Sequence, residues 1–425
     1  MEQPLDALAA QDADPRALQR HLELAADITQ AFAASLDIDE TLRVALHRVM
    51  DSLDAEAASI FVIEEGQGDL VCRACAGPVN ITGTHLKADE GVVGKAFQRN
   101  RVQIVRDVRR EPDFSDAVDK RSGFRTRSIL CAPLTVKNEH LGAIELINKR
   151  SGDGLFHARD KLLLEALCSS AALAIHNSNM AHALVGQERL HRELELASEI
   201  QRNLLPAQAA PGSAVHGMNI PAREVSGDFF DYFPIDDERI CFNVGDVSGK
   251  GINAAMLMAK TSSLFHCLGK TIHDPGTLLQ VLNDELVETS TRGMFVTMIG
   301  GIYEPGSGRL RLANAGHQPV LVLHDSGSAT WIAGSSPPLG IVAGLRFPEC
   351  EVRLQQAAAY LYTDGVTEAR RPDGSSLNPE GFERILRRHG STPRHQRLQA
   401  IVDDILGEVE AFRDDMTMLM IDPEE

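Results

Sequence analysis

Four short acidic motifs in the second half of the chain constrain its fold most strongly. Three combine Asp with Gly: Ser-Gly-Asp-Phe-Phe-Asp at 226–231, Gly-Asp-Val-Ser-Gly-Lys-Gly at 245–251 and Thr-Asp-Gly-Val-Thr-Glu-Ala at 363–369. The fourth, Arg-Asp-Asp-Met-Thr at 413–417, opens the last predicted strand. Each motif alone is typical of a turn, because Asp and Gly are common turn residues. Four of them in order at predicted strand ends instead indicate that their carboxylates meet in the folded protein.

Clustered Asp carboxylates beside glycine predict a site for hard divalent cations. Oxygen ligands suit Mg²⁺ and Mn²⁺, and glycine lets a backbone carbonyl come close enough to bind an ion. Two such ions can polarise a phosphoryl group and activate water at neutral pH. Spacing excludes a P-loop, because its first glycine would fall on Val244 and its Ser or Thr on Gly251.

The overall charge of the chain limits the kinds of molecule that it is expected to bind. The chain has 60 Asp and Glu against 42 Lys and Arg, a formal net charge of −18, which argues against nucleic acid or an anionic membrane. No apolar run approaches the roughly 18 residues of a membrane-spanning helix, and the acidic N-terminus is unlike a signal peptide. Seven scattered cysteines do not form a disulfide framework. We therefore expect a soluble cytoplasmic protein.

The length of 425 residues suits two or three domains, and 43% hydrophobic residues suffice for real cores. We expect an N-terminal helix at 1–36, an α+β sensor domain at 37–180, a helical linker at 181–205 and a second α+β domain at 206–425. In the first half, strands are predicted at 58–63, 69–77, 101–108, 128–136 and 141–149, with a helix at 157–178. In the second half, strands are predicted at 240–244, 294–303, 309–315, 319–324, 359–363 and 416–421. Helices are predicted there at 252–268, 275–289, 379–388 and 396–411.

The linker at 181–205 contains no proline and has a repeating apolar face. Leu190, Leu194, Ala197, Gln201 and Leu204 follow one another at alternating spacings of four and three residues. This repeat predicts a short coiled coil, with Gln201 as a polar seam position, and hence a homodimer. An amphipathic linker that packs on its own domain is the alternative.

The second half resembles the PPM-type, metal-dependent protein Ser/Thr phosphatases, and within them the bacterial SpoIIE or RsbU-like branch. The matching segments, in the family's order, are 199–206, 221–231, 244–259, 295–303, 312–319, 337–341, 362–370 and 414–421. The resemblance implies an αββα sandwich with two Mn²⁺ or Mg²⁺ ions at one end. It also implies hydrolysis of a phosphate ester by metal-activated water, without a covalent phosphoenzyme.

The resemblance also assigns roles to individual residues. Asp246 is expected to bridge both ions, and Val247 to contribute its backbone carbonyl. Asp364 and Asp414 are expected to hold the second ion. Asp228 is expected in the shell of the first ion.

Departures from the family pattern leave some roles open. Ser226 stands where the family usually has Gly, and Ser248 replaces the His that serves eukaryotic relatives as a general acid. Arg223 and His317 are candidates for contacting the substrate phosphate, against a surface Arg and a turn-forming His as the ordinary alternatives. The choice of Asp414 over the neighbouring Asp415 rests on the family pattern alone.

Residues 37–180 resemble a GAF sensor domain, through the segments 89–108 and 129–149. The resemblance implies an antiparallel sheet with flanking helices. Asn148-Lys149, Phe156 and Asp160 resemble a motif of cyclic-nucleotide-binding GAF domains, although Lys161 replaces its Glu. A cyclic nucleotide is therefore one candidate ligand, alongside another small molecule or a ligand-free contact module.

These expectations combine into a ligand-regulated, metal-dependent protein serine/threonine phosphatase in bacterial-type signal transduction. By analogy with the branch, its substrate would be a phosphorylated partner protein, such as a STAS-type anti-sigma-factor antagonist. Two alternatives are a degenerate phosphatase that acts as a binding scaffold and a phosphatase of a small phosphorylated molecule.

Overall fold

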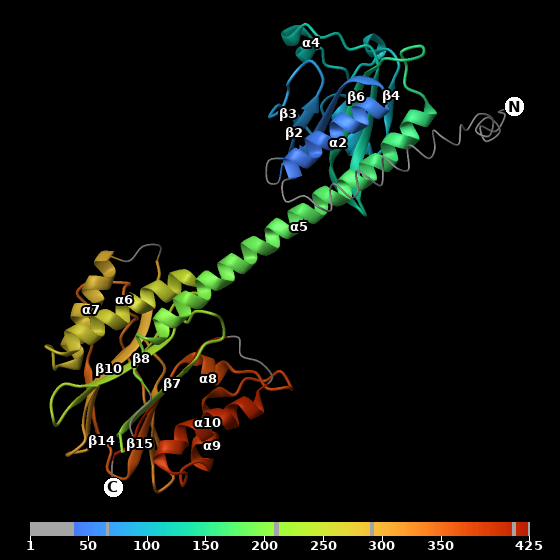
Figure 1. Ribbon diagram of the computed structural model, residues 1–425. Helices are drawn as coiled ribbons and strands as arrows, with labels where there is room; N and C mark the ends of the chain where they lie inside the picture. Colours follow the sequence, from blue (N-terminus) through green and yellow to red (C-terminus); the bar gives the residue numbers. More distant parts are fainter. Residues whose placement is uncertain (1–37, 65–67, 208–211, 290–292, 410–413, 424–425) are drawn as a thin grey trace. The chain divides into compact units, whose positions relative to one another are not determined.

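The computed structural model describes residues 38–64, 68–207, 212–289, 293–409 and 414–423 (Figure 1). The predicted helix at 1–36 lies outside these residues. The chain forms two compact units that divide between Glu188 and Arg189. No helix among the described residues is both long and apolar enough to span a bilayer.

The first unit is built on a six-stranded antiparallel sheet with the strand order β3-β2-β1-β6-β5-β4. Its strands are β1 (Ala55–Ile63), β2 (Asp69–Ala76), β3 (His85–Lys87), β4 (Gln103–Val105), β5 (Ile129–Val136) and β6 (Glu139–Lys149). Its helices are α2 (Ile38–Ser52), α3 (Gly91–Arg99), the 3₁₀ turn η2 (Val108–Arg110), α4 (Ala117–Ser122) and the first part of α5 (Ala158–Arg202).

The two faces of this sheet are covered by different helices. Ile60 and Phe61 point to opposite faces, as successive residues of a strand do. Ile60 packs in a core with Leu46 of α2 and Leu164 of α5. Phe61 packs in a second core with Val93 of α3. The expected antiparallel sheet with flanking helices is therefore confirmed.

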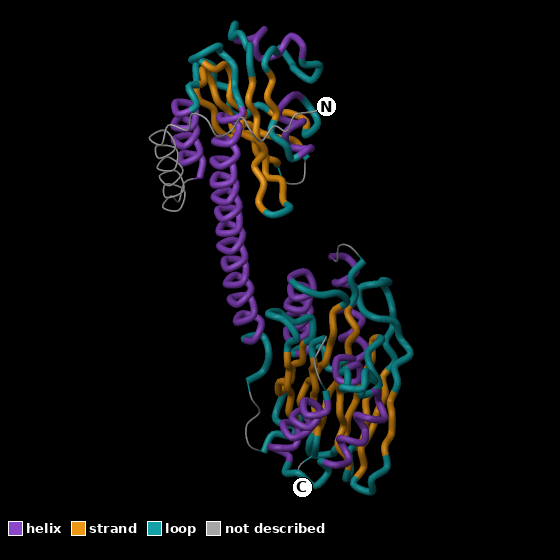
Figure 2. The backbone as a smooth tube through the Cα atoms, turned by 90° about the vertical axis from the view of Figure 1, so that its right-hand side faces the viewer, coloured by secondary structure: helices purple, strands orange, loops and turns teal. Residues whose placement is uncertain are grey.

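The second unit contains two five-stranded antiparallel sheets, seen side by side in Figure 2. The first has the order β14-β11-β10-β9-β8 and the second β13-β12-β15-β16-β7. The first sheet comprises β8 (Phe229–Pro234), β9 (Ile240–Val247), β10 (Val296–Glu304), β11 (Arg309–Ala315) and β14 (Glu349–Arg353). The second comprises β7 (Val215–Ile220), β12 (Val320–His324), β13 (Ala329–Ile332), β15 (Ala357–Tyr362) and β16 (Met416–Ile421).

Helices cover the outer faces of both sheets. Val244 and Ile299 of the first sheet share the central core with Leu361 and Leu419 of the second. Helices α6 (Ile252–Gly269) and α7 (Pro275–Thr289) pack on the first sheet, whereas α9 (Asn378–Arg388) and α10 (Arg394–Glu408) pack on the second. The expected αββα sandwich is therefore confirmed.

Helix α5 is one continuous element of 45 residues rather than separate helices at 157–178 and 181–205. Gly186 lies within it at a position where a Cβ would meet nothing within 4 Å, so no contact requires glycine there. The proposed seam position Gln201 is only 8% exposed, and its amide bonds the backbone of Ser226 and Ala255. This end of α5 therefore packs on its own domain, and the interpretation of Gln201 as a seam residue is wrong. Farther along the helix, Leu184 is 62% exposed.

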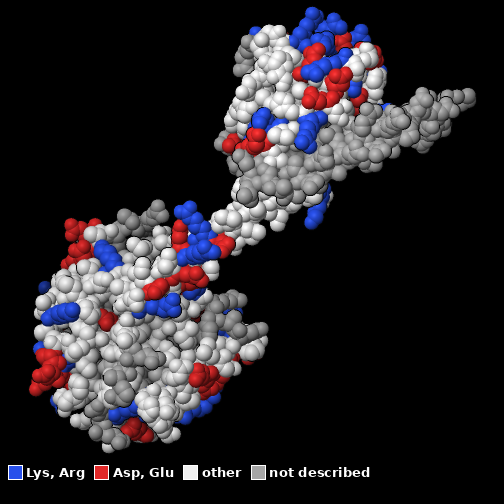
Figure 3. Space-filling model, in the orientation of Figure 1, with Lys and Arg blue, Asp and Glu red and all other residues white. Residues whose placement is uncertain are grey.

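Acidic and basic side chains lie interspersed on each unit in the view of Figure 3. Many of them form ion pairs at the surface, such as Arg73 with Asp39 and Arg43 with Glu40. Pairs as exposed as these contribute little to stability individually.

Candidate metal-binding active site

The four acidic motifs meet at one end of the sandwich, where strands of both sheets begin or end. Asp228 directly precedes β8, and Asp246 is the second-last residue of β9 in the same sheet. In the other sheet, Asp364 follows β15 and opens the short helix α8 (Asp364–Glu368), and Asp414 precedes β16. Antiparallel pairing of β8 with β9, and of β15 with β16, brings these ends together.

Asp228 is the most deeply buried of the four carboxylates, at 3% exposure. Its Oδ2 accepts a hydrogen bond of 2.6 Å from Thr363 Oγ1, which directly follows β15 of the neighbouring sheet. Thr363 is itself fixed, because its N–H donates to the carbonyl of Thr417 and its Oγ1 accepts the Thr417 N–H, both at 3.0 Å. Burial, followed by the charge of Asp246, raises the pKa of Asp228 well above its usual range.

The other carboxylates are crowded by one another. Burial raises the pKa of Asp246 to about 7, and the charge of Asp364 adds to this effect. Burial, and then the charges of Glu368 and Asp414, raise the pKa of Asp364. Like charges held together in a partly buried site favour either protons or bound cations.

Asp415, unlike its neighbour Asp414, accepts hydrogen bonds from the loop that precedes Asp228. Its Oδ1 accepts the Ala222 N–H at 2.8 Å, and its Oδ2 accepts the Gly227 N–H at 2.8 Å and the Ser226 hydroxyl at 2.9 Å. These three bonds brace the loop that carries Asp228. The Ser that departs from the family pattern is thus itself part of the brace. Asp414 remains as the candidate ligand.

Two glycines allow the loops to close over the site. A Cβ on Gly365 would lie 1.9 Å from the carbonyl oxygen of Asp415, so only glycine permits this approach. A Cβ on Gly227 would lie 3.3 Å from the carbonyl oxygen of Val247 and 3.9 Å from Oδ1 of Asp246. The Val247 carbonyl therefore lies next to the same loop as Asp228, where the resemblance places a metal ligand.

His317 lies beside the site but is buried, at 8% exposure. Its Nδ1 contacts Thr297 Oγ1 at 2.8 Å, and Thr297 pairs with Asp246 in the β9–β10 ladder. Burial lowers the pKa of His317 to about 4, so the ring is neutral at pH 7. The Ser248 hydroxyl accepts the Phe295 N–H at 2.9 Å and thereby fixes the loop after β9. Both side chains support the backbone around the carboxylates.

Arg223 is exposed on the loop that Asp415 braces. Within the part of the chain that the structure describes, no acidic side chain pairs with it. Its guanidinium is not brought into contact with the carboxylates, but it lies on a loop whose other end carries Asp228.

The donor set fits divalent metal ions. It consists of carboxylate oxygens and one backbone carbonyl, the ligands that Mg²⁺ and Mn²⁺ prefer. Among the described residues, no three His, Cys, Asp or Glu side chains already stand in metal-binding geometry. The ammonium of Lys250 lies 2.8 Å from Asp414 Oδ2 and supplies positive charge there. The crowding that raises the pKa of Asp246 and Asp364 would be relieved by cations.

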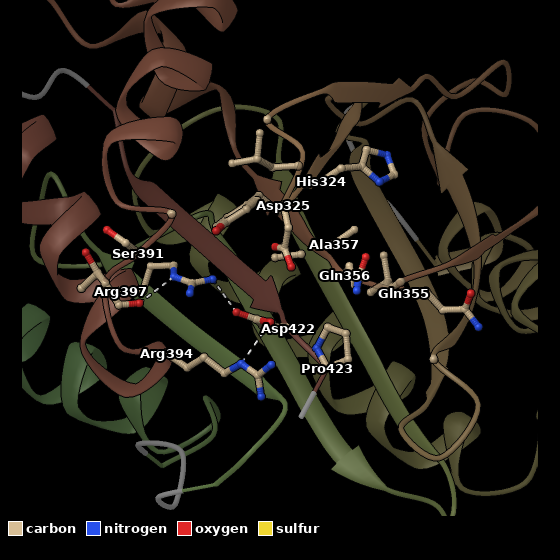
Figure 4. A pocket seen from close by; sticks show the side chains of 18 of the residues that line it. His324, Asp325, Gln355, Gln356, Ala357, Ser391, Arg394, Arg397, Asp422 and Pro423 are labelled. Atoms are coloured by element: carbon tan, nitrogen blue, oxygen red, sulfur yellow. Dashed lines mark hydrogen bonds and ion pairs between the residues drawn. The ribbon is translucent and has the colours of Figure 1, made fainter. Parts of the chain in front are cut away.

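A groove of about 1320 Å³ lies at the opposite strand ends, where β15 begins and β16 ends (Figure 4). Its floor is a closed ion-pair network: Arg394 and Arg397 both bond the buried Asp422, at 3.1 and 2.5 Å. Because each oxygen of Asp422 already has a guanidinium partner, this network fastens β16 to α10. It contains none of the motif carboxylates.

Comparison with known proteins agrees with this geometry. The family model described as Stage II sporulation protein E (SpoIIE) matches residues 236–424, and the GAF domain model matches residues 35–176. The chain therefore joins a GAF-type domain to a SpoIIE-type domain. This agrees with the two compact units and with the αββα sandwich of the second.

Curated relatives match this chain at modest identity. Protein IcfG of Synechocystis sp. is 28% identical over 287 residues, covering 58% of this chain and 44% of that protein. Phosphoserine phosphatase RsbU of Bacillus subtilis is 26% identical over 276 residues, covering 63% of this chain and 80% of that protein. Phosphoserine phosphatase RsbP of Bacillus subtilis is 27% identical, covering 54% of this chain and 58% of that protein. The chain thus spans less than half of IcfG and somewhat more than half of RsbP.

Among solved structures, the SiaA-PP2C domain of Pseudomonas aeruginosa superposes with a TM-score of 0.51. It is 21% identical and covers 56% of this chain and 99% of that domain. At this identity the likeness shows the fold of the SpoIIE-type domain alone.

Proposed function

We propose that this protein is a metal-dependent protein serine/threonine phosphatase whose activity is regulated through its GAF domain. The observation that carries the proposal is the convergence of Asp228, Asp246, Asp364 and Asp414 at one end of the sandwich. The printed name of a relative, phosphoserine phosphatase RsbU, supports the reaction class.

Each carboxylate has a part in holding two Mn²⁺ or Mg²⁺ ions. Asp246 would serve both ions, together with the Val247 carbonyl. Asp364 and Asp414 would hold the second ion, and Asp228 the first. When bound, the ions polarise the phosphoryl group and activate water for attack on phosphorus.

The residues around the ligands keep them in position during the reaction. Thr363 orients Asp228 through its 2.6 Å hydrogen bond. Asp415 anchors the loop at 222–227, from which Arg223 can reach a phosphate and bind two of its oxygens. Neutral His317 supports the ladder behind Asp246 through Thr297. None of these residues forms a covalent bond to the substrate.

The substrate that we propose is a phosphorylated serine or threonine on a partner protein. By analogy with the branch, a STAS-type anti-sigma-factor antagonist is the first candidate. The four carboxylates lie at loop ends rather than in a closed cavity, which suits a phosphorylated side chain of a protein. We place the reaction in the cytoplasm, where such partners occur.

The GAF domain supplies the regulatory input in this proposal. The side chain of Lys149 bonds Asp160 at 2.8 Å and the Leu53 carbonyl at 2.9 Å, which supports a bracing role for this pair. Glu145 of β6 lies directly opposite Ser59 of β1, and burial raises the pKa of Glu145 to about 7. A carboxyl there would favour a ligand with N–H donors, a class that includes cyclic nucleotides.

Helix α5 is the proposed route between the ligand and the metal site, and a homodimer through this helix remains part of the proposal. Leu184 and Leu190, at 62% and 51% exposure, support the dimer because large apolar side chains on an exposed helix favour a partner. The tie between Gln201 and Ser226 supports transmission, because it joins α5 to the loop of Asp228.

The proposal is tested by Mn²⁺-dependent hydrolysis of a phosphoserine protein and of an aryl phosphate, with and without cAMP and cGMP. Asp246→Asn is expected to abolish both reactions, whereas Asp237→Asn, in an exposed turn, is expected to leave them unchanged. Hydrolysis of the aryl phosphate and of small phosphate esters, but of no phosphoprotein, would favour a small-molecule phosphatase. If wild type and Asp246→Asn are equally inactive under every condition, the enzyme proposal fails.

A further inference from the structure

Lys250 reaches across the carboxylate cluster to a distant part of the chain. It stands in the Gly-Lys-Gly segment between β9 and α6. Its ammonium lies 2.8 Å from Oδ2 of Asp414, which follows 164 residues later in the sequence. One cationic side chain therefore pairs directly with a carboxylate that is assigned to the second ion.

The backbone on either side of Lys250 is held in a conformation that favours glycine. Gly249 has φ +96° and Gly251 has φ +79°. A Cβ at either position would meet no atom within 4 Å, so these glycines serve the backbone conformation rather than close packing. This turn directs the lysine back over the site. The Lys250 and Asp414 side chains are 43% and 41% exposed, so the lysine has solvent to move into.

We propose that Lys250 is an internal competitor of the second metal ion, holding Asp414 until a divalent cation takes that carboxylate. The inference rests on the proposed function, because it needs Asp364 and Asp414 to be metal ligands. An oxygen of Asp414 bonded to an ammonium is less available to an ion. Two cations a few ångström apart also repel each other. Binding of the second ion therefore breaks the Lys250–Asp414 pair and releases the ammonium.

The Lys250–Asp414 pair has two opposite effects. The cost is a lower affinity of the second metal site than the carboxylates alone would have. The use is that Asp414 keeps a cationic partner at low metal concentration, so the residues just before β16 stay tied to the turn after β9. Lys250 is thus a positioning residue, and its effect appears first in metal affinity rather than in the chemical step.

The test is a calorimetric titration of the full chain with Mn²⁺, comparing wild type with Lys250→Gln. Loss of an exposed ion pair predicts a roughly two- to fivefold lower dissociation constant for the weaker Mn²⁺ site. Lys250→Arg keeps the cation and is expected to bind Mn²⁺ like wild type. Lys260→Gln removes the same charge on α6, where the lysine bonds Thr289, and is expected to leave Mn²⁺ affinity unchanged.

A second readout does not depend on calorimetry. The Mn²⁺ concentration that produces half of the thermal stabilisation should fall in Lys250→Gln and stay the same in Lys260→Gln. If Lys250→Gln binds Mn²⁺ no more tightly than wild type, or if both Gln variants change equally, the inference about Lys250 is overturned while the metal site stands. If wild type binds no Mn²⁺ at all, the metal site fails and the inference fails with it.

Discussion

The side-chain amide of Gln201 forms a two-point hydrogen bond with the backbone of Ser226. Ser226 N–H donates to Gln201 Oε1 at 3.0 Å, and Gln201 Nε2 donates to the Ser226 carbonyl at 2.8 Å. Gln201 lies in the last turn of α5, and Ser226 lies two residues before Asp228. The end of the helix and the candidate metal loop are thus fastened by one side chain.

Gln201→Ala is expected to lower phosphatase activity and to destabilise the catalytic unit by about 1–3 kcal/mol, because two buried backbone groups of Ser226 lose their partner. Gln187→Ala, on the exposed part of α5, is the matched control and should change neither property. Chemical denaturation and Mn²⁺-dependent hydrolysis measure the two effects. Full activity in Gln201→Ala would contradict a role for this tie in holding the loop.

The neighbours Asp414 and Asp415 should respond differently to the same substitution. Asp415→Asn places an NH₂ group among three donors, and is expected to cost roughly 1–3 kcal/mol of folding stability in the absence of metal. Asp414→Asn should leave that stability within about 0.5 kcal/mol but weaken Mn²⁺ binding at least tenfold. Denaturation and titration with Mn²⁺ separate the two effects. Equal losses of stability in both variants would contradict the division of roles.

Glu145 predicts a pH dependence of stability in the GAF domain. Its folded pKa of about 7 is raised above the ordinary value of 4.5, so the folded state holds a proton that the unfolded state releases first. This contribution to stability is present below about pH 4.5 and is lost as pH rises through about 7. Glu145→Gln should therefore remove that loss and stabilise the domain at pH 8 by roughly 2–3 kcal/mol.

Thermal unfolding between pH 5 and pH 8 measures this difference. Glu90→Gln, in an exposed position before α3, is the control and should follow the wild-type pH profile. Identical pH profiles for wild type and Glu145→Gln would show that Glu145 is not held protonated by burial.

Gly365→Ala should be severely destabilising, because its Cβ would stand 1.9 Å from the Asp415 carbonyl oxygen. Either the turn after β15 or the start of β16 must shift, at a cost of roughly 2–4 kcal/mol, and the distance between Asp364 and Asp414 must change with it. We expect Mn²⁺ binding to be lost as well. Gly306→Ala, where a Cβ meets nothing within 4 Å, is the matched control. Normal Mn²⁺ affinity in Gly365→Ala would contradict the close approach.

Long apolar runs allowed much of the fold to be predicted. The expected β16 at 416–421 and α7 at 275–289 have the observed bounds, because each is a continuous apolar or amphipathic segment. The expected strand at 101–108 shrinks to β4, Gln103–Val105, followed by the 3₁₀ turn η2. The strands β7 and β8 were missed because only half of Val215–Ile220 is apolar and Phe229–Pro234 ends in proline; both are sheet edges.

The candidate site was likewise predictable only in part. Local Asp and Gly patterns predict the ligand carboxylates, but no such pattern predicts the residues that hold those carboxylates in place. Asp415 bonds a loop 188 residues earlier in the chain, and Thr363 bonds Asp228 across 135 residues. No local pattern encodes such pairings, so the bracing roles of Asp415, Ser226 and Gln201 emerge only from the three-dimensional structure.

The hydrogen bond between Asp415 and Gly227 also determines when, during synthesis, the metal-binding loop of this domain can take its final position. At about 5–20 residues per second, a ribosome needs roughly ten to forty seconds to travel from one to the other. Throughout that interval the nascent loop carries Asp228 without its anchor. A chain released before residue 414 would hold most of the sandwich's sequence but neither Asp414 nor the brace of Asp415. Truncated translation products should therefore be inert as catalysts however much of the domain they contain.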